Sequence, residues 1–173
     1  MIINVTQISE DEGLDLTHLY PEGEPALAGG EIRIVGSPSL KLHASREDDR
    51  VNLTGSVSAK VQLDCDRCLK PLYVDVDQSF DLEYIPSGSI TASERVLGQD
   101  DLMTGFYLNQ LIDLDDVVRE QIELSLPMSR LCNDECKGLC GICGARLNDE
   151  PCTCGVDNRD PRWEALRELK IND

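Results

Sequence analysis

The chain has 173 residues, enough for one domain with a substantial apolar core, or for one domain with a small appendage. Its formal charge of −17 disfavours direct binding to a nucleic-acid backbone, because such binding depends on phosphate neutralisation by Lys and Arg. No apolar run approaches the roughly 18 residues needed to span a bilayer, and the first residues lack the features of a signal peptide. We therefore expect a cytoplasmic protein.

The N-terminal part of the chain has weak strand signals. Residues 1–9 are predicted to form a short strand. Residues 10–30 carry acids, Gly and Pro in no regular period, which predicts a loop. Between residues 31 and 44 apolar residues alternate with polar ones, but Gly36 and Pro38 interrupt the pattern, so we expect a strand with a bulge or an edge position.

Residues 51–63 carry the clearest structural signal. Every odd position is apolar or small and the even positions are polar, which is the period of a strand with one buried face. Residues 74–84 mirror this alternation, with apolar side chains on one face and mainly acidic ones on the other. We predict two long antiparallel strands, with the C-x2-C pair Cys65 and Cys68 at the tip of their hairpin.

The rest of the chain is predicted to contain one or two helices. Residues 85–105 lack periodicity and are expected to form a long loop, followed by a short strand at 106–108. Residues 113–124 have an N-cap acid and one apolar face, which predicts a helix. Asp160-Pro161 is typical of a helix start, and Trp163 is predicted to anchor that terminal helix on the sheet.

These elements together predict an α+β protein. It is expected to consist mainly of an antiparallel sheet with a long hairpin, one or two helices and a C-terminal cysteine-rich segment that binds zinc. We expect two parts: an acidic antiparallel β domain with one helix at residues 1–128, and a cysteine-rich, zinc-binding tail at residues 129–173 that ends in a short helix.

Eight cysteines carry the chemical signal. In a reducing compartment an even number of closely spaced cysteines indicates metal ligation before a disulfide framework. Cys140-Gly-Ile-Cys143-Gly resembles a zinc knuckle, in which a tight turn points backbone N–H groups at the sulfurs. We predict one zinc site from Cys140, Cys143, Cys152 and Cys154, and a second from Cys65, Cys68, Cys132 and Cys136. Exchanged partners between the sites, or a single zinc with free hairpin thiols, are the alternatives.

Catalytic uses of the cysteines are less well supported. A redox C-x2-C pair needs a thiolate at a helix N-terminus, whereas Cys65 follows a long strand. The C-x3-C-x2-C spacing at residues 136–143 occurs in radical enzymes, but too few residues follow it to build their barrel. The two histidines, His18 and His43, have no motif around them. We expect a protein that is not an enzyme, with a cytosolic thiol redox or metal-dependent enzyme as the alternative.

Several motifs in order resemble the YceD family, the large ribosomal RNA subunit accumulation proteins. They are CDRCLKPL at the hairpin tip, DLDDVVREQIELSLP, CKGLCGICGARLN, CTC and DPRWEALRELK. The resemblance implies a role in accumulation of large-subunit ribosomal RNA, and hence in assembly of that subunit, with no known catalytic activity. It supplies no mechanism.

Charge distribution indicates which partner to expect. From Asp75 to Ser125 there are twelve acidic residues and two basic ones. Such a surface attracts basic proteins, so we predict that an acidic face binds a basic ribosomal protein or a pre-ribosomal large subunit. The predicted contact residues are Asp75, Asp77, Asp81, Asp113, Asp115 and Asp116. The alternative places the tail against ribosomal RNA, through Arg130, Lys137, Arg146, Arg159 and Arg162.

Overall fold

The computed structural model describes residues 1–23, 32–89 and 104–154. Its elements in chain order are β1 (Ile2–Asn4), the 3-10 turn η1 (Val5–Gln7), β2 (Leu14–Leu19), β3 (Arg33–Glu47), β4 (Arg50–Asp64), β5 (Pro71–Pro86), the 3-10 turn η2 (Ser87–Ser89), β6 (Thr104–Tyr107), β7 (Leu111–Asp113) and α1 (Leu114–Ser125). A five-stranded sheet has the order β2-β3-β4-β5-β6, and β1 pairs with β7. The predicted α+β class, mainly antiparallel, is confirmed.

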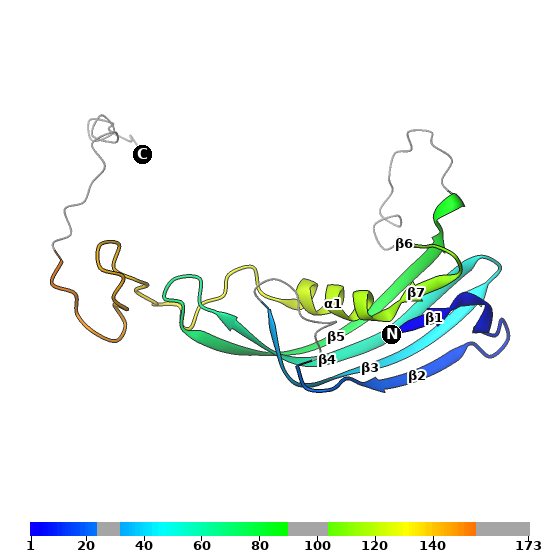
Figure 1. The fold of residues 1–173 in the computed structure, drawn as a ribbon, viewed down its shortest axis with the longest axis horizontal. Helices are drawn as coiled ribbons and strands as arrows, with labels where there is room; N and C mark the ends of the chain where they lie inside the picture. Colours follow the sequence, from blue (N-terminus) through cyan, green and yellow to red (C-terminus); the bar gives the residue numbers. More distant parts are fainter. Residues whose placement is uncertain (24–31, 90–103, 155–173) are drawn as a thin grey trace, which may run out of the picture.

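The hairpin of β4 and β5 is the longest unit of the sheet. Its register runs from Val51 opposite Tyr84 to Asp64 opposite Pro71. The apolar side chains of β4 face inward, and Val51, Leu53 and Val57 are fully buried. The tip of the hairpin extends well beyond α1 and the other strands (Figure 1). The alternation in the sequence therefore predicted both strands and the position of the C-x2-C pair.

Strand β3 carries the predicted irregularity. Its pairing with β4 shifts register between Val35 and Ser39, and Gly36 has a φ of +84°. Between these two pairs β3 has three residues, 36–38, opposite the single residue Ala59 of β4, and the left-handed Gly36 helps the chain to accommodate the two extra residues as a bulge.

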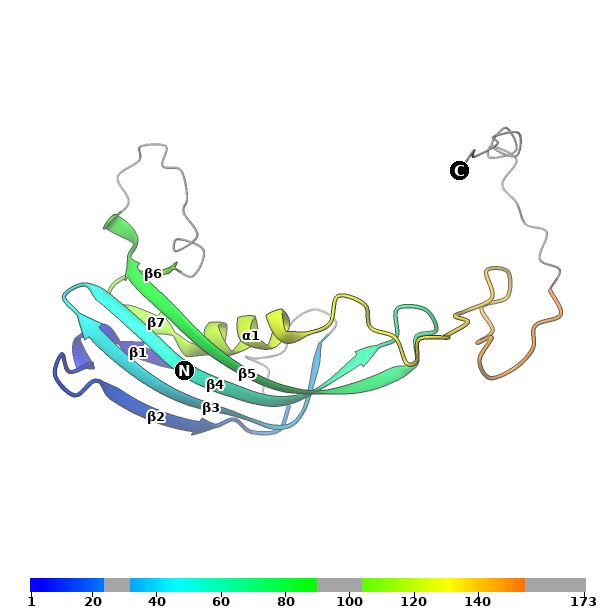
Figure 2. The same cartoon turned by 180° about the vertical axis from the view of Figure 1, so that it is seen from behind.

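Helix α1 covers the inner face of the sheet. The Asp113 carboxylate caps it by accepting a hydrogen bond from the Asp115 backbone N–H at 3.0 Å. Its buried side chains are Leu114, Val117, Val118, Gln121 and Ile122. The pair β1-β7 lies beside the start of the helix (Figure 2). The predicted helix at 113–124 is confirmed to within one residue.

Two short strands were missed, and one segment differs from expectation. Residues 14–19, predicted as loop, form β2 and pair with β3 from Leu14 opposite Ala44 to Leu19 opposite Ser39. Strand β7 has only three residues. Elements this short carry too few alternating positions to stand out, and their pairing partners specify them.

The segment predicted as a loop at 85–105 begins and ends with strand residues. Strand β5 continues to Pro86, η2 follows, and β6 begins at Thr104 and pairs in parallel with β5. The expected short strand at 106–108 thus starts two residues earlier. Residues 90–103 lie outside the described residues, as does the predicted terminal helix with Trp163.

Among the described residues, no helix has the length and apolar character that crossing a membrane requires. The division into parts at residues 1–128 and 129–173 stays a prediction.

Candidate metal centre

The loop at the tip of the β4-β5 hairpin holds two thiols on one side. The Cys65 backbone N–H donates to the Lys70 carbonyl oxygen and the Leu69 N–H donates to the Cys65 carbonyl, both at 2.9 Å. Leu69 has a φ of +56°, which lets the chain reverse within this short loop. As a result Cys65 and Cys68 are both buried although they lie at the end of the sheet.

The chain that leaves α1 returns to this tip. The Asp66 N–H donates to the Arg130 carbonyl oxygen at 2.8 Å, and the Arg130 N–H donates to the Asp66 carboxylate at 2.7 Å. The Arg130 guanidinium also lies 3.3 Å from that carboxylate. These contacts hold the following residues, including Cys132 and Cys136, against the hairpin loop.

Four sulfurs meet at the tip and form what we term the first cysteine group, Cys65, Cys68, Cys132 and Cys136. All four lie within 4.8 Å of one another. The Cys68 and Cys132 sulfurs are 3.6 Å apart, and those of Cys65 and Cys136 are 3.9 Å apart. Sulfurs bound tetrahedrally at about 2.3 Å from one ion lie about 3.8 Å from one another, so this arrangement fits a metal ion.

The second cysteine group consists of Cys140, Cys143, Cys152 and Cys154, again within 4.8 Å of one another. The Cys152 sulfur is 3.5 Å from that of Cys143 and 3.3 Å from that of Cys140. A tight turn at Gly144, with a φ of +72°, brings the first two thiols together. The structure thus assembles the two sets of four that the spacing suggested, and it exchanges no cysteine between them.

Backbone N–H groups favour a thiolate in the first group. Burial raises the pKa of the Cys65 thiol, but backbone hydrogen bonds from Cys68, Arg67 and Cys132 outweigh it and lower the pKa to about 6. A hydrogen bond to Cys136, together with burial, raises the pKa of Cys132 to about 12. Without a cation, some of the four thiols must therefore stay protonated, because four adjacent thiolates would repel one another.

The second group has the same electrostatic arrangement at a more exposed place. Backbone N–H groups of Cys143 and Ile142 lower the pKa of the Cys140 thiol to about 6. A hydrogen bond to Cys152 raises the pKa of Cys154 to about 12. Cys143 is exposed, whereas three members of the first group are buried.

Two side chains that the sequence did not assign to a metal site, Asn148 and Arg146, link the two groups. The Asn148 amide donates to the Cys136 sulfur at 3.0 Å and accepts from the Lys137 N–H at 2.8 Å. The Arg146 guanidinium donates to the carbonyl oxygens of Cys68 and Leu69 at 3.1 and 3.2 Å. Both residues lie between Cys143 and Cys152 in sequence. Nothing in their spacing identifies these contacts, because they depend on how the tail lies on the hairpin loop.

The chemistry of the donors limits which metal ions fit. Four thiolates suit zinc or iron and do not suit calcium or magnesium, which prefer oxygen ligands. A tetrahedron of four protein sulfurs also leaves no open position for a substrate. Each group is therefore suited to a structural role: the first would hold the tail on the hairpin loop, and the second would fold the tail itself.

The six acidic residues predicted as one face lie on two sides of the sheet. Asp75, Asp77 and Asp81 are exposed on the outer face of β5, and Val76 and Phe80 between them point inward. The other three lie at the start of α1, on the inner side, where Asp115 accepts the hydroxyl of Tyr20. Asp113 caps the helix and Asp116 pairs with Arg119. The structure does not bring the two sets together.

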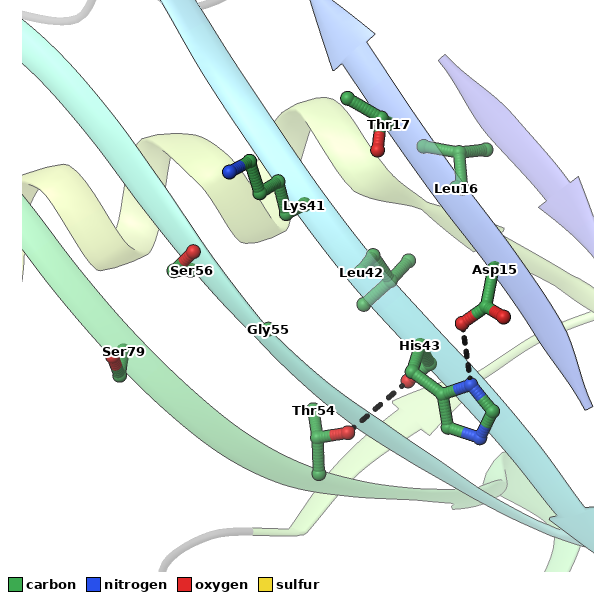
Figure 3. A pocket seen from close by; sticks show the side chains of 10 residues that line it. All are labelled: Asp15, Leu16, Thr17, Lys41, Leu42, His43, Thr54, Gly55, Ser56 and Ser79. Atoms are coloured by element: carbon green, nitrogen blue, oxygen red, sulfur yellow. Dashed lines mark hydrogen bonds and ion pairs between the residues drawn. The ribbon is translucent and has the colours of Figure 1, made fainter.

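A shallow hollow of about 540 Å³ lies on the outer face of the sheet (Figure 3). Thr17, Lys41, Ser56 and Ser79 cross its floor from β2 to β5. His43 Nδ1 lies 2.7 Å from the Asp15 carboxylate, while the Thr54 hydroxyl donates to the His43 backbone carbonyl at 3.4 Å. The hydroxyl therefore does not contact the imidazole ring, and the three residues do not form a nucleophile–base pair.

Residues 53–170 match the family model of the large ribosomal RNA subunit accumulation protein YceD. The chain belongs to the YceD family. The matched range includes both cysteine groups and helix α1, so the resemblance seen in the motifs is confirmed.

Proteins similar to this chain are known from bacteria and plants. An uncharacterized protein of Mycobacterium tuberculosis (strain ATCC 25618 / H37Rv) is 30% identical over 149 residues, which cover 84% of this chain and 69% of the relative. The large ribosomal RNA subunit accumulation protein YCED homolog 1, chloroplastic, of Arabidopsis thaliana is 23% identical, covering 87% of this chain and 50% of the relative. The Zea mays protein of the same name is 29% identical, covering 76% and 55%. No solved structure was found to match.

Proposed function

We propose that this protein is a non-catalytic, zinc-binding factor in biogenesis of the large ribosomal subunit, acting in the cytoplasm. The match to the YceD family over residues 53–170 carries this proposal, since relatives in that family are named for accumulation of large-subunit ribosomal RNA. The described geometry supports a holding role, because both cysteine groups are closed by four sulfurs.

Zinc is the metal that best suits both groups. It is redox-inert, accepts four thiolates in a tetrahedron and stabilises small segments that have little apolar core of their own. Elemental analysis of the protein purified without chelator should find two zinc ions per chain, and Cys143→Ser should reduce this to one. Iron in place of zinc, or fully alkylated thiols with no metal, would contradict the assignment.

The partner is a basic ribosomal protein, or a pre-ribosomal large subunit that exposes one. The charge of −17 favours such a partner over ribosomal RNA itself. Asp75, Asp77 and Asp81 form the acidic row available for it on the outer face of β5. In the tail, Arg130 and Arg146 already contact the hairpin loop, which weakens the case for a direct RNA contact there.

Affinity capture tests the partner. The tagged full-length chain is incubated with cell lysate at low and at high salt, and bound ribosomal proteins and ribosomal RNA are quantified separately. We expect capture of at least one basic ribosomal protein at low salt, with loss when the three acids are replaced by Asn. Ribosomal RNA that stays bound after the co-captured ribosomal proteins have been removed would instead support the alternative of an RNA-binding tail.

A thiol redox enzyme is the second candidate, and the low pKa of the Cys65 thiol, about 6, is the observation that favours it. An exposed reactive thiolate would be alkylated quickly at neutral pH. Cys65 is fully buried, so we expect slow alkylation in the metal-loaded protein. Rapid, selective alkylation of Cys65 would revive the redox function.

A further inference from the structure

Strand β5 is paired on both sides only at its C-terminal end. It pairs with β4 from Pro71 to Tyr84, whereas β6 pairs with it only from Glu83 to Pro86. Within the described residues, no backbone strand pairs with residues 71–82 from the other side (Figures 1 and 2). A free strand edge of this length presents a row of unpaired N–H and C=O groups, which is a template for a further strand.

The outer face of this edge is acidic at alternate positions. Asp75, Asp77 and Asp81 are exposed, and they lie about 7 Å apart for each step of two residues. Asp75 lies 3.4 Å from the Lys60 ammonium, and Asp77 accepts the Ser58 hydroxyl at 3.2 Å. Neither Asp77 nor Asp81 pairs with a cation among the described residues. Two carboxylates without a cationic partner in the described part of the chain thus border this edge.

The inner face of the same edge is apolar and incompletely covered. Val76 and Phe80 are buried in the core. Leu72, Val74 and Leu82 are only partly buried, although they pack against that core. Apolar side chains of an added strand would cover the area that these three leave exposed.

We propose that residues 71–82 of β5 accept an extended segment of a basic protein as an added strand. In that segment Lys or Arg would alternate with apolar residues, so that the cations face Asp77 and Asp81 and the apolar side chains face Leu72, Val74 and Leu82. Recognition of this kind takes affinity from backbone hydrogen bonds and specificity from alternate side chains. The inference rests on the proposed binding of a basic ribosomal protein and states how that partner is held.

Charge argues against a second copy of this chain as the occupant. Two β5 edges paired with each other would bring their acidic rows together, and like charges opposite one another destabilise a strand pair. The same acids that prevent self-association are neutralised by a basic strand.

Synthetic peptides test the proposal on the metal-loaded, full-length protein. The probe is a nine-residue peptide of alternating Lys and Val, and its affinity is measured by fluorescence anisotropy. Two further versions carry N-methyl groups on the Lys amides or on the Val amides. Because alternate amides of a strand point to opposite edges, we expect one methylated version to lose binding and the other to keep it.

Paired variants test the acids. Asp77→Asn with Asp81→Asn should weaken binding of the alternating peptide by about three- to tenfold, through loss of two cross-strand ion pairs. The matched control, Asp11→Asn with Glu12→Gln, makes the same change of charge in the turn before β2 and should leave binding nearly unchanged. Amide hydrogen exchange in β5 should slow when the peptide binds.

Three results would overturn the proposal. Equal binding of both methylated peptides would mean that only charge attracts them, so that strand addition fails while binding of a basic partner stands. Absence of binding by the alternating peptide would also reject it. Concentration-dependent protection of β5 without peptide would show a second copy on the edge. Failure of the proposed function is seen separately, as loss of ribosomal-protein capture from lysate.

Discussion

At the scale of single residues, Asn148 is the contact that most directly affects a candidate metal site without being a ligand. Its amide donates to the Cys136 sulfur at 3.0 Å, which stabilises a thiolate there and fixes its direction. Residues of this kind commonly change metal affinity strongly when they are replaced.

We expect Asn148→Ala to weaken metal binding at the first cysteine group by about 10- to 100-fold, because the sulfur loses its only side-chain donor outside the group among the described residues. Chelator competition with cobalt as a spectroscopic probe would measure this. Asn52→Ala, on the outer face of β4, serves as the control. Unchanged affinity would show that Asn148 does not position the ligand.

Asp115 links the helix start to the N-terminal part of the chain. Burial raises the pKa of this carboxyl, but hydrogen bonds from the terminal ammonium and the Tyr20 hydroxyl outweigh it, so the pKa lies below its ordinary value of 3.8. A lowered folded-state pKa contributes stability above that ordinary value, and the contribution is lost as pH falls through the folded pKa.

Tyr20→Phe should therefore destabilise the fold by about 1–2 kcal/mol near neutral pH, since a buried charge-assisted hydrogen bond is lost. The deficit relative to the native chain should shrink as pH falls below 3.8, where Asp115 becomes protonated in both proteins. Urea unfolding of both proteins across this pH range measures it. A deficit that does not vary with pH would mean that another interaction of the Tyr20 hydroxyl, and not its bond to the ionised Asp115, is responsible.

At the scale of elements, the hairpin of β4 and β5 depends on one glycine. A Cβ added at Gly55 would lie 2.3 Å from the Lys41 carbonyl oxygen and 2.9 Å from the Phe80 ring. Neighbouring backbone and an aromatic ring thus occupy the space that a side chain would need. The ring of Phe80 can cover the strand only because Gly55 is there.

Gly55→Ala should destabilise the protein by about 1–3 kcal/mol by overpacking, although Ala normally suits a strand no worse than Gly. Thermal or denaturant unfolding measures the change. Gly88→Ala, where an added Cβ meets nothing within 4 Å, is the matched control and should be close to neutral. Equal stability of the Gly55 variant would show that β3 and β5 can move apart at this point.

At the scale of the whole molecule, two clusters of buried side chains hold together the residues that the structure describes, and Leu72 packs against both. The sheet, α1 and β1-β7 share one continuous apolar core. The second cluster consists of Cys65, Cys68 and Cys136 with a few neighbours at the hairpin tip. The first does not need metal, whereas the second has too little apolar surface to hold residues 129–154 by itself.

Removal of metal by a chelator should release residues 129–154 from the hairpin while the sheet stays folded. Hydrogen exchange resolved by segment would show loss of protection in the tail only, with protection in β4 and α1 retained. A single cooperative loss of all structure on chelation would contradict this, since it would mean that the cysteine groups also support the main core.

The local sequence pattern was sufficient to predict the elements whose burial and capping are set by their own residues. Strict alternation predicted β4 and β5, and an N-cap with one apolar face predicted α1, because both patterns reflect burial along a single element. The spacing of the cysteines suggested the same two sets of four but left exchanged partners and a single zinc site open, and the structure selected between them. The short strands β2 and β7 could not be predicted in this way, because their pairing with β3 and β1 specifies them.

Only the tertiary structure decided which distant residues meet. It placed Cys132 and Cys136 on the hairpin loop 64 and 71 residues away from Cys68 and Cys65, and it brought Asn148 to a sulfur of the first group. It also separated the six acidic residues that were predicted to form one face, because strand alternation and helix capping direct their side chains to opposite sides of the sheet. Sequence fixes what each segment must bury or neutralise, and long-range packing selects the partner that does so.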